Sequence, residues 1–152
     1  MFVANNVQIS KYLTVGDVTK SNTAIKLGIN NQLPIELLEN AKSFGKLYDI
    51  IYDHFKGNIY FNSIYRGPAL NDALGGATNS QHMKCLAGDL EGKNGVKNSD
   101  IFKFVKENLQ FSQLIWEFGT STEPAWVHVG IGTAKQILKA YKVGKKTYYK
   151  NF

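Results

Sequence analysis

A chain of 152 residues, of which 43% are hydrophobic and 20% charged, is long enough to bury one hydrophobic core and lacks the polar composition of a disordered protein. Its formal net charge of +6 at pH 7 is compatible with an anionic partner, although a solvated basic surface is the favoured interpretation. A single arginine and no recognisable nucleic-acid-binding module argue against specific binding of DNA or RNA. A single cysteine, Cys85, excludes an intrachain disulfide. We therefore expect one domain spanning residues 1–152.

The sequence predicts neither an export signal nor a membrane span. Residues 1–10 interleave asparagine and glutamine with apolar residues, so they lack the basic start and the continuous apolar run of a signal peptide. No stretch approaches the roughly 20 apolar residues that cross a bilayer. We expect a monomer that is synthesised in the cytoplasm and does not span a membrane.

The hydrophobic pattern before residue 80 predicts mainly helices. Helices are expected over residues 19–28, 34–55 and 68–74, the second of them on the strongest apolar repeat at three- and four-residue intervals. Residues 58–65 are rich in aromatic and β-branched side chains and predict a strand. The loose alternation over residues 1–12 indicates a short edge strand.

The pattern after residue 80 mixes strands and helices. Strands are expected over residues 86–90, 112–118 and 124–131, and helices over residues 98–109 and 134–141. Because the elements do not alternate as regular βαβ units, the sequence predicts an α+β fold with a small antiparallel sheet and flanking helices.

The polar loop over residues 119–123 predicts a hairpin between two of these strands. If Phe118 faces Ala125, then Glu117 lies opposite Trp126 and on the same sheet face as His128. A slip of one residue would move Glu117 to the other face.

Two histidines and an aspartate form the ligand set of an open catalytic zinc site, and the chain offers His82, Asp89 and His128. On one helix, His82 and Asp89 would lie about 10 Å apart along the axis, too far for one ion with bonds near 2 Å. A turn must therefore bring them together, and an irregular loop before His82 with a strand carrying Asp89 would supply it. The spacing alone is more often a coincidence than a metal site.

The chain carries several short motifs in a fixed order: SIYR at residues 63–66, Asn71, GGA at 75–77, SQHMKCLAGDL at 80–90, QLIWEFG at 113–119 and WVHV at 126–129. In their order and spacing, these motifs make the chain resemble the zinc D-alanyl-D-alanine carboxypeptidase and endopeptidase family, whose fold is shared with the Hedgehog signalling domain. The resemblance runs from about Thr14 to Ile131 and implies one zinc ion bound by His82, Asp89 and His128.

The resemblance also implies roles around the metal. Arg66 corresponds to an arginine that contacts the peptide substrate and helps to polarise the scissile carbonyl, Ser80 to a residue that supports substrate binding, and Trp126 packs beside the site. Without the resemblance, Arg66 would be interpreted as a surface or helix-capping ion pair. Ser80 is equally well interpreted as a local cap of its loop.

The position of the general base differs from the family pattern. Several relatives place an acidic residue three positions before the last histidine ligand, where this chain has Ala125. Hydrolysis needs a carboxylate that accepts a proton from water, and the hairpin register favours Glu117 over the loop residue Glu123. Without that role, Glu117 is a solvated strand carboxylate and Glu123 a loop cap.

Two further departures concern small residues. Cys85 replaces a glycine of the family pattern, and Gly130 follows the last ligand motif where relatives commonly have serine. A thiol near the metal could become a ligand because zinc accepts sulfur. A small buried side chain is the favoured interpretation of Cys85.

The resemblance implies a zinc-dependent peptidase acting on peptidoglycan stem peptides, either a D-Ala-D-Ala carboxypeptidase or an L,D-endopeptidase. Lacking a signal peptide and a separate wall-binding segment, it is expected to be a phage lysis enzyme (endolysin) or a virion component that reaches the cell wall after release. The alternative is a non-catalytic zinc-containing binding or structural module, because Hedgehog domains keep the metal without established peptidase activity and position 125 lacks an acid. The sequence leaves the cleaved bond open.

Overall fold

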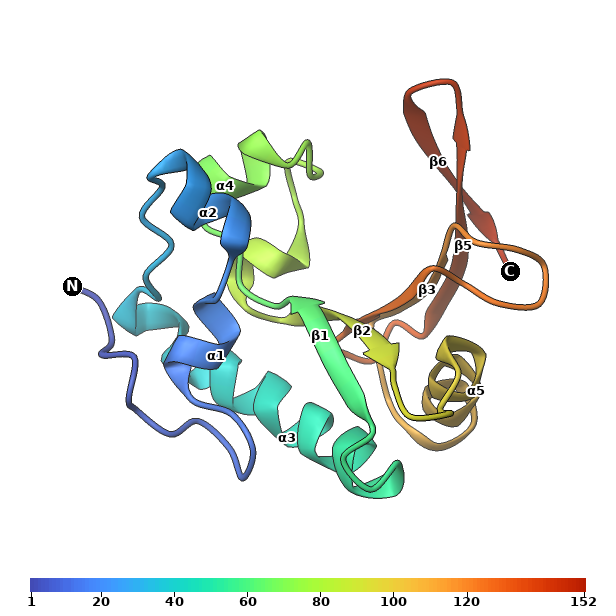
Figure 1. Ribbon diagram of the computed structural model, residues 1–152, viewed down its shortest axis with the longest axis horizontal. Coiled ribbons are helices and arrows are strands. Elements are labelled where there is room, and N and C mark those ends of the chain that lie inside the picture. Colours follow the sequence, from blue (N-terminus) through green and yellow to red (C-terminus); the bar gives the residue numbers. More distant parts are fainter. The chain divides into compact units, whose positions relative to one another are not determined.

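The computed structural model describes all 152 residues and divides them into two compact units. The first, here called the helical unit, comprises Met1–Asp49 and Ser63–Gly88, and the second, the sheet unit, comprises Ile50–Asn62 and Asp89–Phe152. Helices combined with a six-stranded, mostly antiparallel sheet confirm the predicted α+β class (Figure 1). None of the helices combines the length and the apolar character of a membrane span. The expectation of a single domain stays a prediction.

Short helices and turns dominate the helical unit. The helices α2 and α4 confirm those predicted over residues 19–28 and 68–74. The first of them, α2, begins after the Ser21 cap and ends at Gly28 in the left-handed conformation (φ 66°). The edge strand expected over residues 1–12 is wrong, because that segment makes only isolated bridges. The elements are α1 (Val15–Thr19), α2 (Asn22–Leu27), the 3-10 turn η1 (Ile35–Leu37), α3 (Leu38–His54, up to Asp49 in this unit), α4 (Pro68–Ala73) and the 3-10 turn η2 (Gln81–Lys84).

The core of this unit forms on α3, whose apolar stripe was the strongest helical signal. Phe44 has no solvent-exposed surface, and its ring packs against Gly88, the residue before Asp89. A Cβ atom at Gly88 would lie 2.4 Å from Cζ of Phe44. The strand leading to Asp89 can therefore approach α3 only because Gly88 has no side chain.

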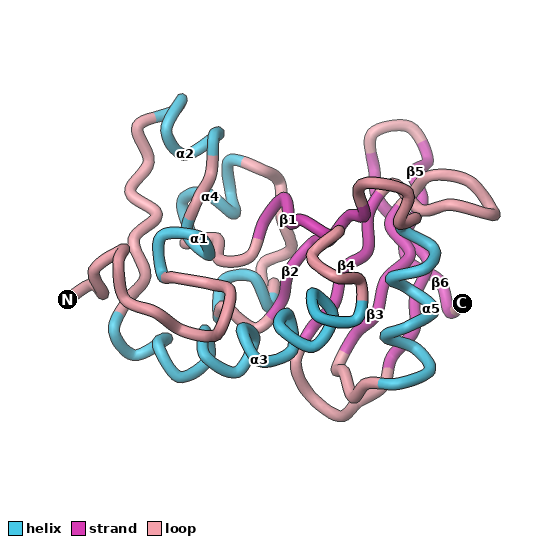
Figure 2. Tube along the Cα trace, turned by 60° about the horizontal axis from the view of Figure 1, so that its bottom comes forward, coloured by secondary structure: helices cyan, strands magenta, loops and turns pink.

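The sheet unit contains six strands in the order β1-β2-β4-β3-β5-β6. One face of the β3–β4 pair is covered by α5 (Asn98–Asn108), which runs alongside these strands in Figure 2. Phe102 of α5 meets Trp116 edge to face, with ring centroids 5.2 Å apart. The strands are β1 (Ile59–Ser63), β2 (Ala87–Gly92), β3 (Gln113–Glu117), β4 (Trp126–Gly130), β5 (Gln136–Val143) and β6 (Lys146–Asn151).

The register of β3 and β4 is the one predicted from the loop between them. Glu117 pairs with Trp126 and Ile115 with His128 in an antiparallel ladder. Partners in such a ladder share a face, as do residues two apart on one strand. Glu117, Trp126 and His128 therefore occupy one face of the sheet, opposite the face that α5 covers.

The helix expected over residues 134–141 is wrong, because β5 occupies this segment. β5 runs parallel to β3 and pairs with β6 through the two-residue turn at Gly144 (φ 62°) and Lys145 (Figure 1). Leu138 and Ala140 are buried while their neighbours are more exposed, which is the two-residue alternation of a half-buried strand. The basic tail is thus the outer hairpin of the sheet.

The close approach of Gly88 to Phe44 predicts a specific loss of stability. We expect Gly88→Ala to lower the free energy of unfolding by about 1–3 kcal/mol, because the added methyl must displace a buried ring. In a Phe44→Leu background, which lacks the colliding ring atoms, the same change should cost less. Urea unfolding of the four proteins measures this coupling, and an equal cost in both backgrounds would show that the contact does not constrain Gly88.

Candidate metal and catalytic site

His82 lies on η2 and is fixed by its neighbours in the helical unit. Its Nδ1 lies 2.8 Å from the backbone oxygen of Ile64, and because a carbonyl oxygen can only accept, Nδ1 carries the proton and Nε2 the lone pair. The amide of Arg66 donates to the backbone oxygen of His82 at 3.1 Å. The SIYR segment thus orients both the imidazole and the backbone of His82, an arrangement typical of histidines that bind metal through Nε2.

Ser80 caps the turn that carries His82. Its Oγ accepts a hydrogen bond from the amide of His82 at 3.2 Å, which is the local capping role foreseen for it. Cys85 ends the same turn with φ 55°.

Two buried asparagines hold the loops around this turn. The side chain of Asn31 accepts from the amide of Gly67 at 2.7 Å and donates to the oxygen of Tyr65 at 3.2 Å. Asn71 donates to the oxygen of Ala77 at 3.0 Å. Asn71 was identified only through its motif and Asn31 was not predicted, because nothing in the local sequence distinguishes an asparagine that braces a loop from one on the surface.

Asp89 and His128 form the part of the site that lies in the sheet unit. They lie on the neighbouring strands β2 and β4, with Oδ1 of Asp89 3.2 Å from Nδ1 of His128, and their side chains are only 14% and 9% exposed. Adjacent ligand atoms of a tetrahedral ion with bonds near 2 Å are about 3.3 Å apart. The observed separation fits two neighbouring ligands of one zinc ion as well as a direct hydrogen bond.

His82 in the helical unit and Asp89 and His128 in the sheet unit each offer one ligand atom to a metal ion. The donor set of two imidazoles and one carboxylate is one that zinc accepts, and three protein ligands leave a position for water or substrate.

The two candidate bases differ in their surroundings. Glu123 caps α5, since its carboxylate accepts from the amide of Ser99 at 2.8 Å and from its hydroxyl at 2.7 Å. Glu117 is 7% exposed and shares its sheet face with His128. The loop-cap interpretation of Glu123 is confirmed, which leaves Glu117 as the stronger candidate base.

Cys85 has the environment of a structural side chain. It is fully buried, burial raises the pKa of its thiol to about 12, and it does not belong to the group of possible metal ligands. Its φ of 55° is a left-handed conformation that glycine adopts without strain. This backbone requirement explains why the resembled family favours glycine at the position.

Comparison with known families covers most of the chain. The family model described as peptidase M15 matches residues 11–130, and the search of curated proteins gave no match. The resemblance inferred from motifs over residues 14–131 is thereby confirmed. Every site residue named above lies within the matched range, whereas β5 and β6 lie beyond its end.

The burial of Cys85 predicts that its thiol is inert and that it does not bind the metal. We expect a thiol reagent at pH 8 to leave Cys85 unmodified in the folded protein and to modify it after unfolding in urea. Cys85→Ala should keep the metal content of the parent, measured by atomic absorption. Rapid modification of the folded protein, or metal loss from a folded Cys85→Ala variant, would contradict the assignment.

Proposed function

The chain belongs to the peptidase M15 family, a family of zinc D-Ala-D-Ala carboxypeptidase-like enzymes, and from this premise we propose that it is a zinc-dependent peptidase of bacterial peptidoglycan stem peptides. The observation that carries the proposal is that the chain supplies two histidines and an aspartate as a possible metal group within the family-matched residues. The net charge of +6 suits an anionic cell wall.

In this proposal, His82, Asp89 and His128 hold one zinc ion. The Ile64 carbonyl fixes the tautomer of His82 so that Nε2 can act as the ligand, and Asp89 supplies negative charge against the cation. When bound, zinc polarises the scissile carbonyl and makes water a stronger nucleophile near neutral pH.

Glu117 is proposed as the general base. A buried carboxylate on the same sheet face as His128 can take a proton from the attacking water and deliver it to the leaving amine. Glu123 is the weaker candidate, because both of its carboxylate oxygens are used to cap α5.

Arg66, Ser80 and Trp126 are proposed to bind the substrate. The Arg66 guanidinium would position the peptide and draw electron density from the scissile carbonyl, a charge-assisted contact. Trp126, two residues before His128 on the same face, offers an apolar wall beside the reaction. Ser80 contributes by holding the turn of His82.

A non-catalytic zinc module is the second candidate function. One observation favours it, namely that Ala125 stands where several relatives carry an acid. It predicts a protein that holds zinc and releases no peptide fragments. A role in phage lysis or in a virion, with action on the wall after release, stays a prediction.

The peptidase proposal predicts opposite behaviour of two glutamates. Glu117→Gln should lower kcat on purified peptidoglycan by about 10²–10⁴-fold with zinc content unchanged, because it removes the base and keeps the shape. Glu123→Gln, the matched control, should keep most of the activity and lose about 1 kcal/mol of stability as the helix cap weakens. Mass analysis of released fragments measures the rates and also identifies the cleaved bond.

The results that would contradict this proposal are distinct. A zinc-loaded parent that releases no fragments would favour the non-catalytic module. Equal activity of the parent and Glu117→Gln would remove Glu117 from the mechanism without removing the peptidase.

A further inference from the structure

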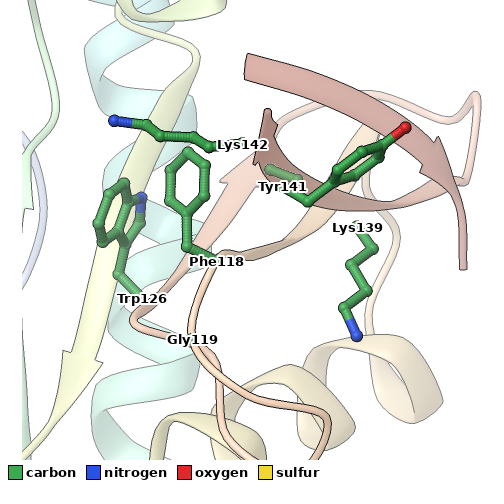
Figure 3. A pocket seen from close by; sticks show the side chains of 7 residues that line it. Phe118, Gly119, Trp126, Lys139, Tyr141 and Lys142 are labelled. Carbon is green, nitrogen blue, oxygen red and sulfur yellow. The ribbon is translucent and has the colours of Figure 1, made fainter. Parts of the chain in front are cut away.

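A pocket of about 520 Å³ opens at one end of the sheet unit. It lies where the end of β3 and the start of β4 meet β5, and its lining residues are Phe118, Gly119, Trp126, Lys139, Ala140, Tyr141 and Lys142 (Figure 3). Two of these are lysines and none is acidic. Trp126 is also the proposed apolar wall of the reaction site.

The strand register places the pocket next to the proposed reaction centre. His128, Ile115 and Leu138 form one row across three strands, and Trp126, Glu117 and Ala140 form the next. Lys142 follows Ala140 by two residues and so begins a third row on the same face. Measured along the strands from the row of His128, Trp126 lies about 7 Å away and Lys142 about 13 Å.

Aromatic rings and a cation line one side of the pocket together. The rings of Phe118 and Trp126 meet edge to face with centroids 5.3 Å apart, and Nζ of Lys142 lies 5.3 Å from the centroid of Phe118. Figure 3 shows the Lys142 side chain extended over Phe118 towards Trp126, whereas the side chains of Lys139 and Tyr141 point away from this pair.

A left-handed backbone conformation at Phe118 places its ring in the pocket. Alternation along β3 would send its ring to the α5 side of the sheet, but its φ of 55° interrupts the strand. The ring packs instead against the cluster of Ile115, Leu138 and Ala140, which share the face of His128. The left-handed conformation of a bulky residue is unfavourable by about 1–2 kcal/mol, so packing in this corner must compensate for it.

The charge around the pocket selects an anion. No aspartate or glutamate follows Glu123 in the sequence, whereas six lysines do. The nearest acid in the register, Glu117, lies one row closer to His128 than Lys142. A carboxylate entering the pocket is therefore attracted to the Lys142 end and repelled from the Glu117 end.

We infer that this pocket is a subsite for an acidic residue of the peptide substrate, whose carboxylate pairs with Lys142 and whose aliphatic part lies on Phe118 and Trp126. The inference rests on the proposed peptidase function. An extended peptide advances about 3.3–3.6 Å per residue, so the acidic residue lies two to four positions from the scissile bond at His128. Because Lys142 belongs to β5, beyond the family-matched residues, this selectivity is a property of the C-terminal hairpin.

The test compares two stem peptides that differ in one group. One carries glutamate with a free carboxylate at this distance from the scissile bond, and the other carries the corresponding primary amide, which keeps the shape and removes the charge. We expect the parent to cleave the acidic peptide with a kcat/KM about fivefold higher, as for one partly exposed ion pair. Lys142→Gln should lose this preference and keep its rate on the amide peptide.

A matched control and a second measurement separate this subsite from the peptidase function itself. Lys146→Gln makes the same charge change on β6, outside the pocket, and should keep the preference. Calorimetry measures the binding of both peptides to metal-stripped protein. The parent should bind the acidic peptide more tightly than the amide peptide, and Lys142→Gln should lose this preference.

A parent that cleaves and binds both peptides equally overturns the subsite and leaves the peptidase standing. A parent that cleaves neither peptide, yet binds the acidic one preferentially through Lys142, supports the subsite and contradicts the proposed function. Loss of the preference in Lys146→Gln as well would replace the pocket with a general charge effect.

Discussion

The hydrogen bond between Nδ1 of His82 and the carbonyl oxygen of Ile64 is the contact on which the proposed metal group depends most. It fixes which imidazole nitrogen carries the proton and the direction in which the other one points. The SIYR segment makes this contact and also binds the backbone of His82 through the amide of Arg66. The SIYR segment, which contains the proposed substrate-binding residue Arg66, therefore also orients the imidazole of a proposed metal ligand.

The sheet unit adds a second constraint, the register of β3 and β4. The same pairing that puts Glu117 opposite Trp126 puts His128 on the face of both, and β5 extends the rows of that face to Lys142. The proposed base and apolar wall thus lie opposite each other one row beyond His128, and the proposed carboxylate subsite begins in the next row. The residues proposed for catalysis and selectivity in the sheet unit lie on one face, while packing against α5 occupies the other.

Local sequence patterns predicted much of this arrangement, whereas tertiary contacts determine the parts that the sequence did not predict. The sequence predicted the β3–β4 register because a short loop and two-residue alternation constrain each other. The sequence predicted a helix where β5 lies, because the apolar residues Ile137, Leu138 and Tyr141 also fit a helical spacing. Pairing with β3 selects the strand. The left-handed turns at Cys85 and Phe118 and the bracing by Asn31 depend on tertiary contacts that a single sequence does not reveal.

X-ray absorption at the zinc edge, on protein purified in the presence of zinc, tests the central claim most directly. We predict one ion per chain, with two imidazoles and further oxygen ligands at about 2.0 Å and no sulfur. A sulfur shell near 2.3 Å would make Cys85 a ligand. That result, or a signal without two imidazoles, would contradict the assignment of His82, Asp89 and His128 to a common metal ion.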